Sequence, residues 1–373
     1  MKPPRKAEPT DKIMTGNPGA PRPVIKPHPQ TLSAEAGHSV EGIVLPPSNT
    51  PTLIHVGLHK TASTSLQHIW LKMANMAPMS PTFAAGMLDL LHEAVASDTV
   101  INLSPLKDEP MFLNTGDDAD KWQVFSTEAL SVFKWLTTPP AEVARIYFDR
   151  QVDLFTRLCP NAHILIVVRE PQAWVKSIYM QYLKTGGTLT FRRFLLVHGA
   201  DLRFVLAVDR LKAAWASRYG GDRVHILPFE LFRDDPSHFF AELHARTGIP
   251  RPPAALLTTH LNISLNAREG EFLRKTNEFM ALLTKSESLD DASRAMLNKV
   301  KPVVAATLRS EIQHHKHSLL SRTASKLTPA PAHGGLTADM QTFIRDRFIP
   351  MLAVETGDLC GYLENYANTE PVE

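Results

Sequence analysis

The chain has 373 residues, of which 43% are hydrophobic and 21% are charged, and its formal net charge is +2. This length and composition are ordinary for a soluble globular protein with one large or two small domains. The small net charge argues against a general nucleic-acid binder and against a surface strongly attracted to membranes. The two cysteines form no disulfide framework, and the sequence shows neither a signal peptide nor an apolar run of about eighteen residues. We therefore expect a cytoplasmic protein without a membrane span.

Residues 1–50 are rich in Pro, Lys, Ser and Gly and contain few large apolar side chains. Such a segment buries too little surface to offset the entropy of ordering its backbone. We therefore predict a disordered or loosely packed N-terminal arm over residues 1–50, with a weak strand signal at 39–45. The folded domain is predicted to cover residues 51–373.

Residues 52–71 have the pattern of a strand, a polar loop and a helix. The strand is apolar and β-branched, the loop GLHKTASTS is rich in small and hydroxyl side chains, and apolar residues recur at helical spacing from Leu66. Such a loop exposes backbone N–H groups in front of the positive end of the helix dipole. We predict that it binds a phosphate-like or sulfate-like group and that Lys60 contacts this group. A Ser/Thr-rich helix cap with a solvated lysine is the alternative.

Further along the chain, apolar strands alternate with helices, after a region at 77–120 that carries several turn signals. Strands are predicted at 122–126, 163–168 and 224–228, and helices at 140–158, from residue 171, at 202–218, through 239–243 and at 337–353. Residues 265–336 are expected to form a helical insertion that ends in a flexible loop. This alternation is typical of βαβ units, so we predict an α/β fold: a parallel β-sheet flanked by helices, with an additional C-terminal helical region.

A second group of polar residues follows the strand at 163–168, whose continuous apolar run is typical of a sheet buried on both faces. Arg169 stands at the end of this strand, and Ser177 follows on a helix that begins near Pro171. Ligands of parallel sheets bind beyond the C-terminal ends of the strands, where Lys60 is also expected. Arg169 and Ser177 can therefore converge on one phosphate. A strand-end salt bridge and a helix-surface serine are the alternatives.

Together, GLHKTASTSLQ and the pattern REPxxWxxSxY at 169–179 resemble the sulfotransferase family that uses 3′-phosphoadenosine 5′-phosphosulfate (PAPS), in particular its bacterial and carbohydrate-directed branch. The likeness covers residues 52–260 in order and includes the segments LPFELFRDDP and HLNIS. It implies a P-loop NTPase-like sheet, PAPS as co-substrate and no required metal. It also implies that the acceptor is a small molecule or glycan, of a carbohydrate or glycolipid type.

This resemblance also assigns roles to individual residues. Lys60 would contact the bridging oxygen or the sulfuryl group, Arg169 and Ser177 would hold the 3′-phosphate, and two basic residues of a closing loop would add phosphate contacts. The implied cofactor-binding residues are Lys60, Thr61, Ala62, Ser63, Thr64, Ser65, Arg169, Ser177, Arg322 and Lys326. Ala62 occupies a position where the family usually has glycine, so the loop must be less contorted there or strained.

Sulfuryl transfer needs a base that removes the proton of the acceptor. Glu128 is the first candidate because it follows the strand at 122–126 on the same edge, where carbohydrate-directed relatives often place a catalytic glutamate. The alternative is that Glu128 caps a helix. His59 is the second candidate, with a loop-structuring role as the alternative. A C-terminal histidine patch is interpreted as a solvated helix face and not as a metal site: His314, His315 and His317.

Two other functions are compatible with parts of the pattern. A nucleotide kinase is disfavoured because it would place its lysine at the helix start and would need an acidic magnesium ligand. A non-catalytic relative that binds adenosine bisphosphate is compatible with Ala62. The leading hypothesis is a PAPS-dependent sulfotransferase.

Overall fold

The computed structural model describes residues 39–40, 43–44, 50–113, 121–131, 141–257, 266–286, 289–314 and 336–356. These residues belong to one compact unit, Ala36–Glu373. The predicted arm lies almost entirely outside the described residues. Two short antiparallel strands, β1 (Ser39–Val40) and β2 (Ile43–Val44), fall where the weak strand signal was noted.

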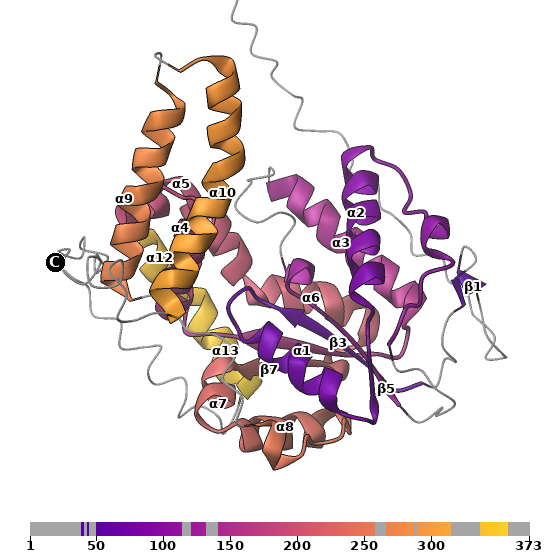
Figure 1. Ribbon diagram of the computed structural model, residues 1–373. Coiled ribbons are helices and arrows are strands. Elements are labelled where there is room, and N and C mark those ends of the chain that lie inside the picture. Colours follow the sequence, from indigo (N-terminus) through magenta and orange to yellow (C-terminus); the bar gives the residue numbers. More distant parts are fainter. Residues whose placement is uncertain are drawn as a thin grey trace, which may run out of the picture. The chain divides into compact units, whose positions relative to one another are not determined.

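A five-stranded parallel sheet forms the centre of this unit (Figure 1). Its strand order is β4-β5-β3-β6-β7. Val56 of β3 pairs with Thr127 of β5 and with Ile166 of β6, so the C-terminal ends of these strands lie at the same edge. The predicted α/β fold is confirmed. The strands are β3 (Thr52–Gly57), β4 (Met76–Pro78), β5 (Trp122–Thr127), β6 (His163–Val168) and β7 (Val224–Pro228).

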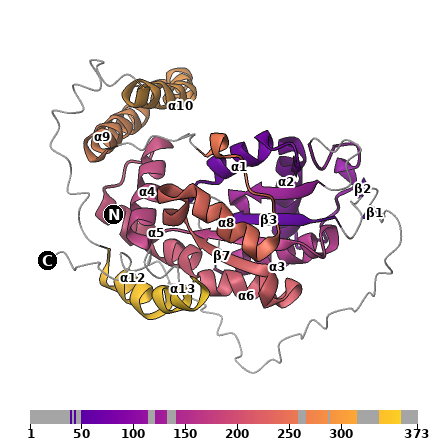
Figure 2. The ribbon, with the colours of Figure 1, turned by 90° about the horizontal axis from the view of Figure 1, so that it is seen from below.

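Helices cover both faces of the sheet (Figures 1 and 2). Side chains alternate along a strand, so Leu53 and Ile54 of β3 enter different cores. Leu53 packs with apolar side chains of α1 (Ser63–Lys72), α7 (Phe229–Asp234) and α8 (Pro236–Thr247). The core that contains Ile54 is completed by α2 (Pro81–Ala96), α3 (Ala141–Leu158), α4 (Pro171–Lys184), α5 (Phe191–Leu206) and α6 (Val208–Tyr219).

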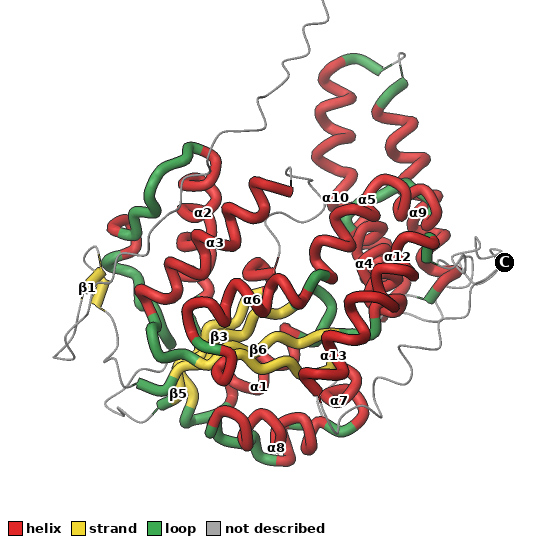
Figure 3. Tube along the Cα trace, turned by 180° about the vertical axis from the view of Figure 1, so that it is seen from behind, coloured by secondary structure: helices red, strands yellow, loops and turns green. Residues whose placement is uncertain are grey.

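The C-terminal region is helical, as predicted. Helices α9 (Ala267–Thr284) and α10 (Asp291–His314) run side by side as a hairpin (Figures 1 and 3). Asn277 of α9 donates to the carbonyl oxygens of Leu183 and Gly187, which attaches the hairpin to the end of α4. The predicted closing helix is α12 (Ala338–Phe343) and α13 (Ile349–Thr356), joined by a π-helical turn (Ile344–Phe348).

Two parts of the chain differ from the sequence prediction. The single helix predicted at 202–218 is wrong, because the chain forms α5 and α6 with a break at Ala207, whose ψ is 62°. The region 77–120 contains β4 at the sheet edge and the 16-residue helix α2, neither of which was predicted. Short 3₁₀ turns occupy Ser104–Leu106, Glu128–Ser131, Gly221–Arg223 and Ala254–Leu256.

No helix in the described parts of the chain is both long and apolar enough to cross a membrane.

Candidate active site

The loop between β3 and α1 has a strongly curved backbone. Lys60 has φ 69° and Ala62 has φ 64°, both in the left-handed region that L-residues rarely adopt. Ala62 is the N-cap of α1 and offers no side-chain cap, so it leaves the first N–H groups of the helix for another acceptor. The sequence left two possibilities at Ala62, a less contorted loop or a strained one, and the positive φ of Ala62 shows that the loop is strained there.

Gly57 is required at the start of this loop by close packing. A Cβ atom on Gly57 would lie 2.3 Å from Ser63 Oγ and 3.1 Å from the His55 ring. A larger residue at position 57 would therefore force the Ser63 hydroxyl and the His55 ring to move. The glycine thus allows β3 to pass directly beneath the first turn of α1.

Side chains from distant segments hold the loop carbonyls. Trp174 Nε1 donates to the carbonyl oxygen of His59 at 2.7 Å, and Arg169 Nη1 donates to that of Lys60 at 3.0 Å. Thr61 Oγ1 donates to the carbonyl oxygen of Leu58 at 2.6 Å. These three hydrogen bonds fix the orientation of the peptide groups that follow Leu58, His59 and Lys60.

The predicted loop residues do not share one environment. The side chains of Thr61 and Ser63 are buried, whereas Thr64 is exposed and Ser65 is half-buried. The Thr61 hydroxyl is used within the loop, so this residue can serve an anion through its backbone N–H. The Ser63 side chain is 1% exposed, and its hydroxyl lies close enough to Glu128 to lower the pKa of that carboxyl by hydrogen bonding.

Glu128 and His59 lie together beside Lys60. His59 Nε2 is 3.6 Å from Glu128 Oε2. Burial, with a smaller effect of the Lys60 charge, lowers the pKa of His59 to about 4, so the imidazole is neutral near pH 7. Burial raises the pKa of Glu128, and Lys60 and Ser63 offset part of this rise. The pair is therefore a carboxyl group of raised pKa next to a neutral imidazole, at the end of β5.

A buried network beneath the loop was not predicted from the sequence. His55 Nδ1 lies 2.8 Å from Ser126 Oγ, and Gln67 Nε2 donates to the Ser126 carbonyl oxygen at 2.9 Å and to its hydroxyl at 3.2 Å. The His55 ring packs edge-on against Trp70, with centroids 5.5 Å apart. This network joins β3, β5 and α1 next to the loop between β3 and α1. From the sequence alone, a histidine inside an apolar strand such as His55 cannot be distinguished from an ordinary core residue, so its contact with Ser126 could not be predicted.

Arg169 lies between the loop and α7. Besides its bond to the Lys60 carbonyl, its guanidinium lies over the Phe229 ring, 4.8 Å from the centroid. The next residue, Glu170, caps α4 by accepting from the N–H groups of Gln172 and Ala173. Ser177 lies on α4 and is half-buried. The segment LPFELF at 227–232 therefore supplies the platform for Arg169, a role that its sequence did not reveal.

Other predicted positions lie outside the described residues. They are Arg322 and Lys326, the loop at 323–335, the HLNIS segment and two histidines of the C-terminal patch, His315 and His317. Among the described residues, no three His, Cys, Asp or Glu side chains gather in a way that could hold a metal ion.

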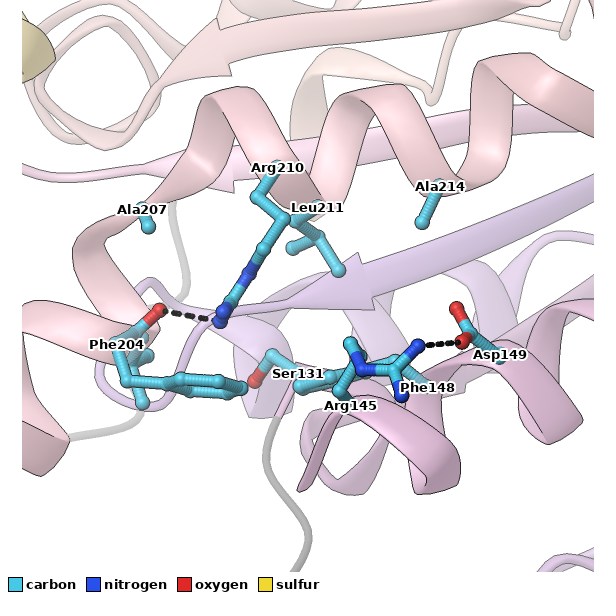
Figure 4. Close-up of a pocket in the computed structure, with 10 residues that line it drawn as sticks. Ser131, Arg145, Phe148, Asp149, Phe204, Ala207, Arg210, Leu211 and Ala214 are labelled. Carbon is cyan, nitrogen blue, oxygen red and sulfur yellow. Dashed lines mark hydrogen bonds and ion pairs between the residues drawn. The ribbon is translucent and has the colours of Figure 1, made fainter. Parts of the chain in front are cut away.

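A small apolar cavity borders the segment that follows Glu128 (Figure 4). Ser131 Oγ lies 2.9 Å from the carbonyl oxygens of both Gly57 and Glu128, which ties the cavity wall to the loop. Arg210 stacks on Phe204 at 3.5 Å, and Arg145 pairs with Asp149 at 3.5 Å. The lining residues are Ser131, Arg145, Phe148, Asp149, Phe204, Val205, Ala207, Arg210, Leu211 and Ala214.

The parallel sheet and the anion-type loop between β3 and α1 define an α/β protein of the P-loop type. The family model described as "Sulfotransferase family" matches residues 51–253, which is more than half of the chain. The chain belongs to the sulfotransferase family.

Among the solved structures that resemble the chain are two sulfotransferases. A sulfotransferase from Alicyclobacillus acidocaldarius has 17% identity and a TM-score of 0.41, and the match covers 64% of this chain and 97% of that chain. The sulfotransferase domain from the curacin biosynthetic pathway has 11% identity and a TM-score of 0.32, with 67% of this chain and 96% of that chain covered. No curated protein matches the chain.

Proposed function

We propose that the chain transfers a sulfuryl group from PAPS to a hydroxyl or amine of a carbohydrate or glycolipid-type acceptor. One observation carries the proposal: Lys60, Arg169 and Glu128 meet at one edge of the sheet in a chain of the sulfotransferase family. The 3.0 Å bond from Arg169 to the Lys60 carbonyl joins the two predicted binding segments. Glu128 is the base that completes the site.

The donor set fits an anionic nucleotide. The N–H groups at the start of α1 and the Ser63 hydroxyl would hold the 5′-phosphate, and Lys60 would contact the phosphosulfate. Arg169 and Ser177 would hold the 3′-phosphate, because a guanidinium presents several N–H donors in a fork. Phe229 keeps the Arg169 side chain in place from the side opposite the loop.

Bound PAPS would supply an electrophilic sulfur and a leaving bisphosphate. Glu128 takes the proton of the acceptor while the acceptor oxygen or nitrogen bonds to sulfur. Lys60 stabilises the charge that develops on the 5′-phosphate as the bond from this phosphate to sulfur breaks. A raised pKa makes Glu128 a stronger base than an ordinary carboxyl, whereas His59, with its pKa lowered to about 4, is better suited to orient Glu128.

The cavity next to Ser131 supports an acceptor that approaches from the Glu128 side. Phe148, Phe204 and Leu211 line this cavity together with Arg145 and Arg210 (Figure 4). Phe148 and Arg210 already pack on the Phe204 ring, so the carbohydrate-type acceptor rests on the branch of the family that the sequence motifs resemble.

The experiment that tests the proposal is transfer of ³⁵S-labelled sulfuryl from PAPS to a panel of oligosaccharides and glycolipids. We expect labelled acceptor and 3′,5′-adenosine bisphosphate in equal amounts. Lys60→Ala should abolish transfer, whereas Lys72→Ala, at the exposed C-terminal end of α1, should retain it. Transfer of phosphate from ATP with Mg²⁺ to the same acceptors would overturn the proposal in favour of a kinase.

A further inference from the structure

Helices α9 and α10 carry a cluster of exposed apolar side chains. Of the nine exposed large apolar residues in the described part of the chain, five belong to this hairpin. A contiguous apolar surface of this kind marks a site that binds another protein or a membrane. The five residues, which we call the hairpin face, are Phe279 and Leu282 of α9 and Met296, Val300 and Val303 of α10.

The α9 part of the hairpin face points away from α4. Asn277 is bound to the end of α4, and a Cβ atom on Gly270 would lie 2.7 Å from Met180 Sδ, so Asn277 and Gly270 mark the side of α9 that packs on α4. At about 3.6 residues per turn, Phe279 and Leu282 lie on the opposite side. The hairpin also extends away from the sheet (Figures 1 and 3), which leaves both side chains exposed.

The α10 part of the hairpin face is one stripe along the helix. Met296, Val300 and Val303 are spaced by four and three residues, which places them on one side of α10. Half-buried Leu297 and Val304 mark the side that packs on α9, and the stripe lies about a quarter-turn from them. Because α10 runs antiparallel beside α9, the stripe emerges on the same side of the hairpin as the two exposed α9 residues. The five side chains therefore form one surface.

Exposed lysines border the hairpin face. Lys275 lies one turn before Phe279, and Lys299 lies one turn after Met296. Neither lysine forms an ion pair with another described residue, whereas nearby acidic side chains are paired within their own helices: Glu271 and Glu278 with Arg274, and Asp291 with Arg294. The border of the hairpin face is therefore positive, although the whole chain has a formal net charge of only +2.

We propose that the hairpin face binds an anionic lipid surface. Its apolar side chains would enter the boundary between headgroups and acyl chains, and Lys275 and Lys299 would extend their ammonium groups to the anionic headgroups. The face is the outer side of two projecting helices, whereas a partner helix would need a groove to lie in. A second copy of the chain fits less well, because a two-fold contact would bring the lysines of both hairpins together. The inference goes beyond the proposed function and requires neither its donor nor its acceptor.

Cosedimentation of the full chain with vesicles tests the proposal. We expect binding to vesicles of phosphatidylcholine mixed with phosphatidylglycerol, weaker binding to phosphatidylcholine alone, and release by added salt. The double variant Phe279→Ser/Leu282→Ser should bind the mixed vesicles at least about tenfold more weakly. The matched control is Leu196→Ser/Val197→Ser, which removes two exposed apolar side chains from α5 and should bind as the wild type does.

A second pair of substitutions tests the charged border. Lys275→Glu/Lys299→Glu should also lose binding to the mixed vesicles, and both lysines are exposed, so the variant should keep its fold. Equal binding of the hairpin variants and the control would overturn the proposal. So would a wild-type chain that ignores anionic vesicles, or one whose hairpin face is covered by a second copy in sedimentation. Sulfuryl transfer is not measured in this assay, so its failure would leave the proposed function standing.

Discussion

Ala62→Gly should stabilise the protein, because Ala62 is the N-cap of α1 and lies in the left-handed region that glycine adopts without strain. Ala62 has φ 64° and ψ 20°, and its side chain caps nothing. An L-residue in this conformation costs roughly 1–2 kcal/mol relative to glycine. Glycine in turn loses about 0.5–1 kcal/mol more backbone entropy on folding than alanine does. The difference predicts a gain of about 0.5–1 kcal/mol in the free energy of unfolding.

Urea denaturation followed by circular dichroism measures this gain, since a higher midpoint at unchanged m-value is a change in stability. Ala85→Gly is the matched control, because Ala85 is exposed within α2 and has ordinary helical geometry. The control should lose about 1 kcal/mol. Equal losses in both variants would refute the view that the loop strains Ala62.

Three further predictions concern the site and the buried histidines. Glu128→Gln should lower turnover by at least about a hundredfold and leave nucleotide affinity unchanged in calorimetry, and unchanged turnover would remove Glu128 from the mechanism. The wild-type rate should fall as pH drops through the pKa of Glu128, which burial raises above its ordinary value. Arg169→Ala should weaken binding of 3′,5′-adenosine bisphosphate more than that of 5′-AMP, and equal affinity to the wild type in a folded variant would contradict its assignment to the 3′-phosphate. Burial lowers the pKa of His55 to about 3 and those of His59 and His225 to about 4. As pH drops below about 6.5, these histidines therefore bind protons in the unfolded chain before they do so in the folded chain. The free energy of unfolding is highest above this pH and falls as pH drops towards 4, by at most about 1.4 kcal/mol per pH unit for each histidine. His225→Gln should flatten this dependence in urea titrations at pH 7 and pH 5, and an identical slope would show that His225 does not contribute.

The main strands could be predicted because each is a short apolar run buried on both faces. β4 could not, since it has three residues, includes Pro78 and lies at the sheet edge, where the proline needs no hydrogen bond to a neighbour. Pro81 is one of the turn signals of the region 77–120, yet it occupies the first turn of α2, where proline is favoured. Thr190 caps α5 by accepting from the Arg193 N–H, a helix-start signal that marks the beginning of α5, whereas Ala207 between α5 and α6 provides no side-chain cap.

In the candidate site, features set by neighbouring residues could be predicted, and features set by contacts between distant segments could not. Lys60 and Arg169 could be predicted because each follows the end of a parallel strand. The curvature of the loop could not, because it depends on Trp174, which binds the carbonyl oxygen of a residue 115 positions earlier in the chain. The contact of His55 with Ser126 also joins two strands 71 residues apart, and periodicity alone assigns His55 to the core.

Calorimetric titration of the wild-type chain with 3′,5′-adenosine bisphosphate and with ATP plus Mg²⁺ tests the central claim most directly. A site built for PAPS must bind the product bisphosphate through both the loop that follows β3 and Arg169. We predict that the bisphosphate binds at least about tenfold more tightly than ATP with Mg²⁺, a difference of about 1.4 kcal/mol. Tighter binding of ATP with Mg²⁺ would contradict the assignment of this site to PAPS.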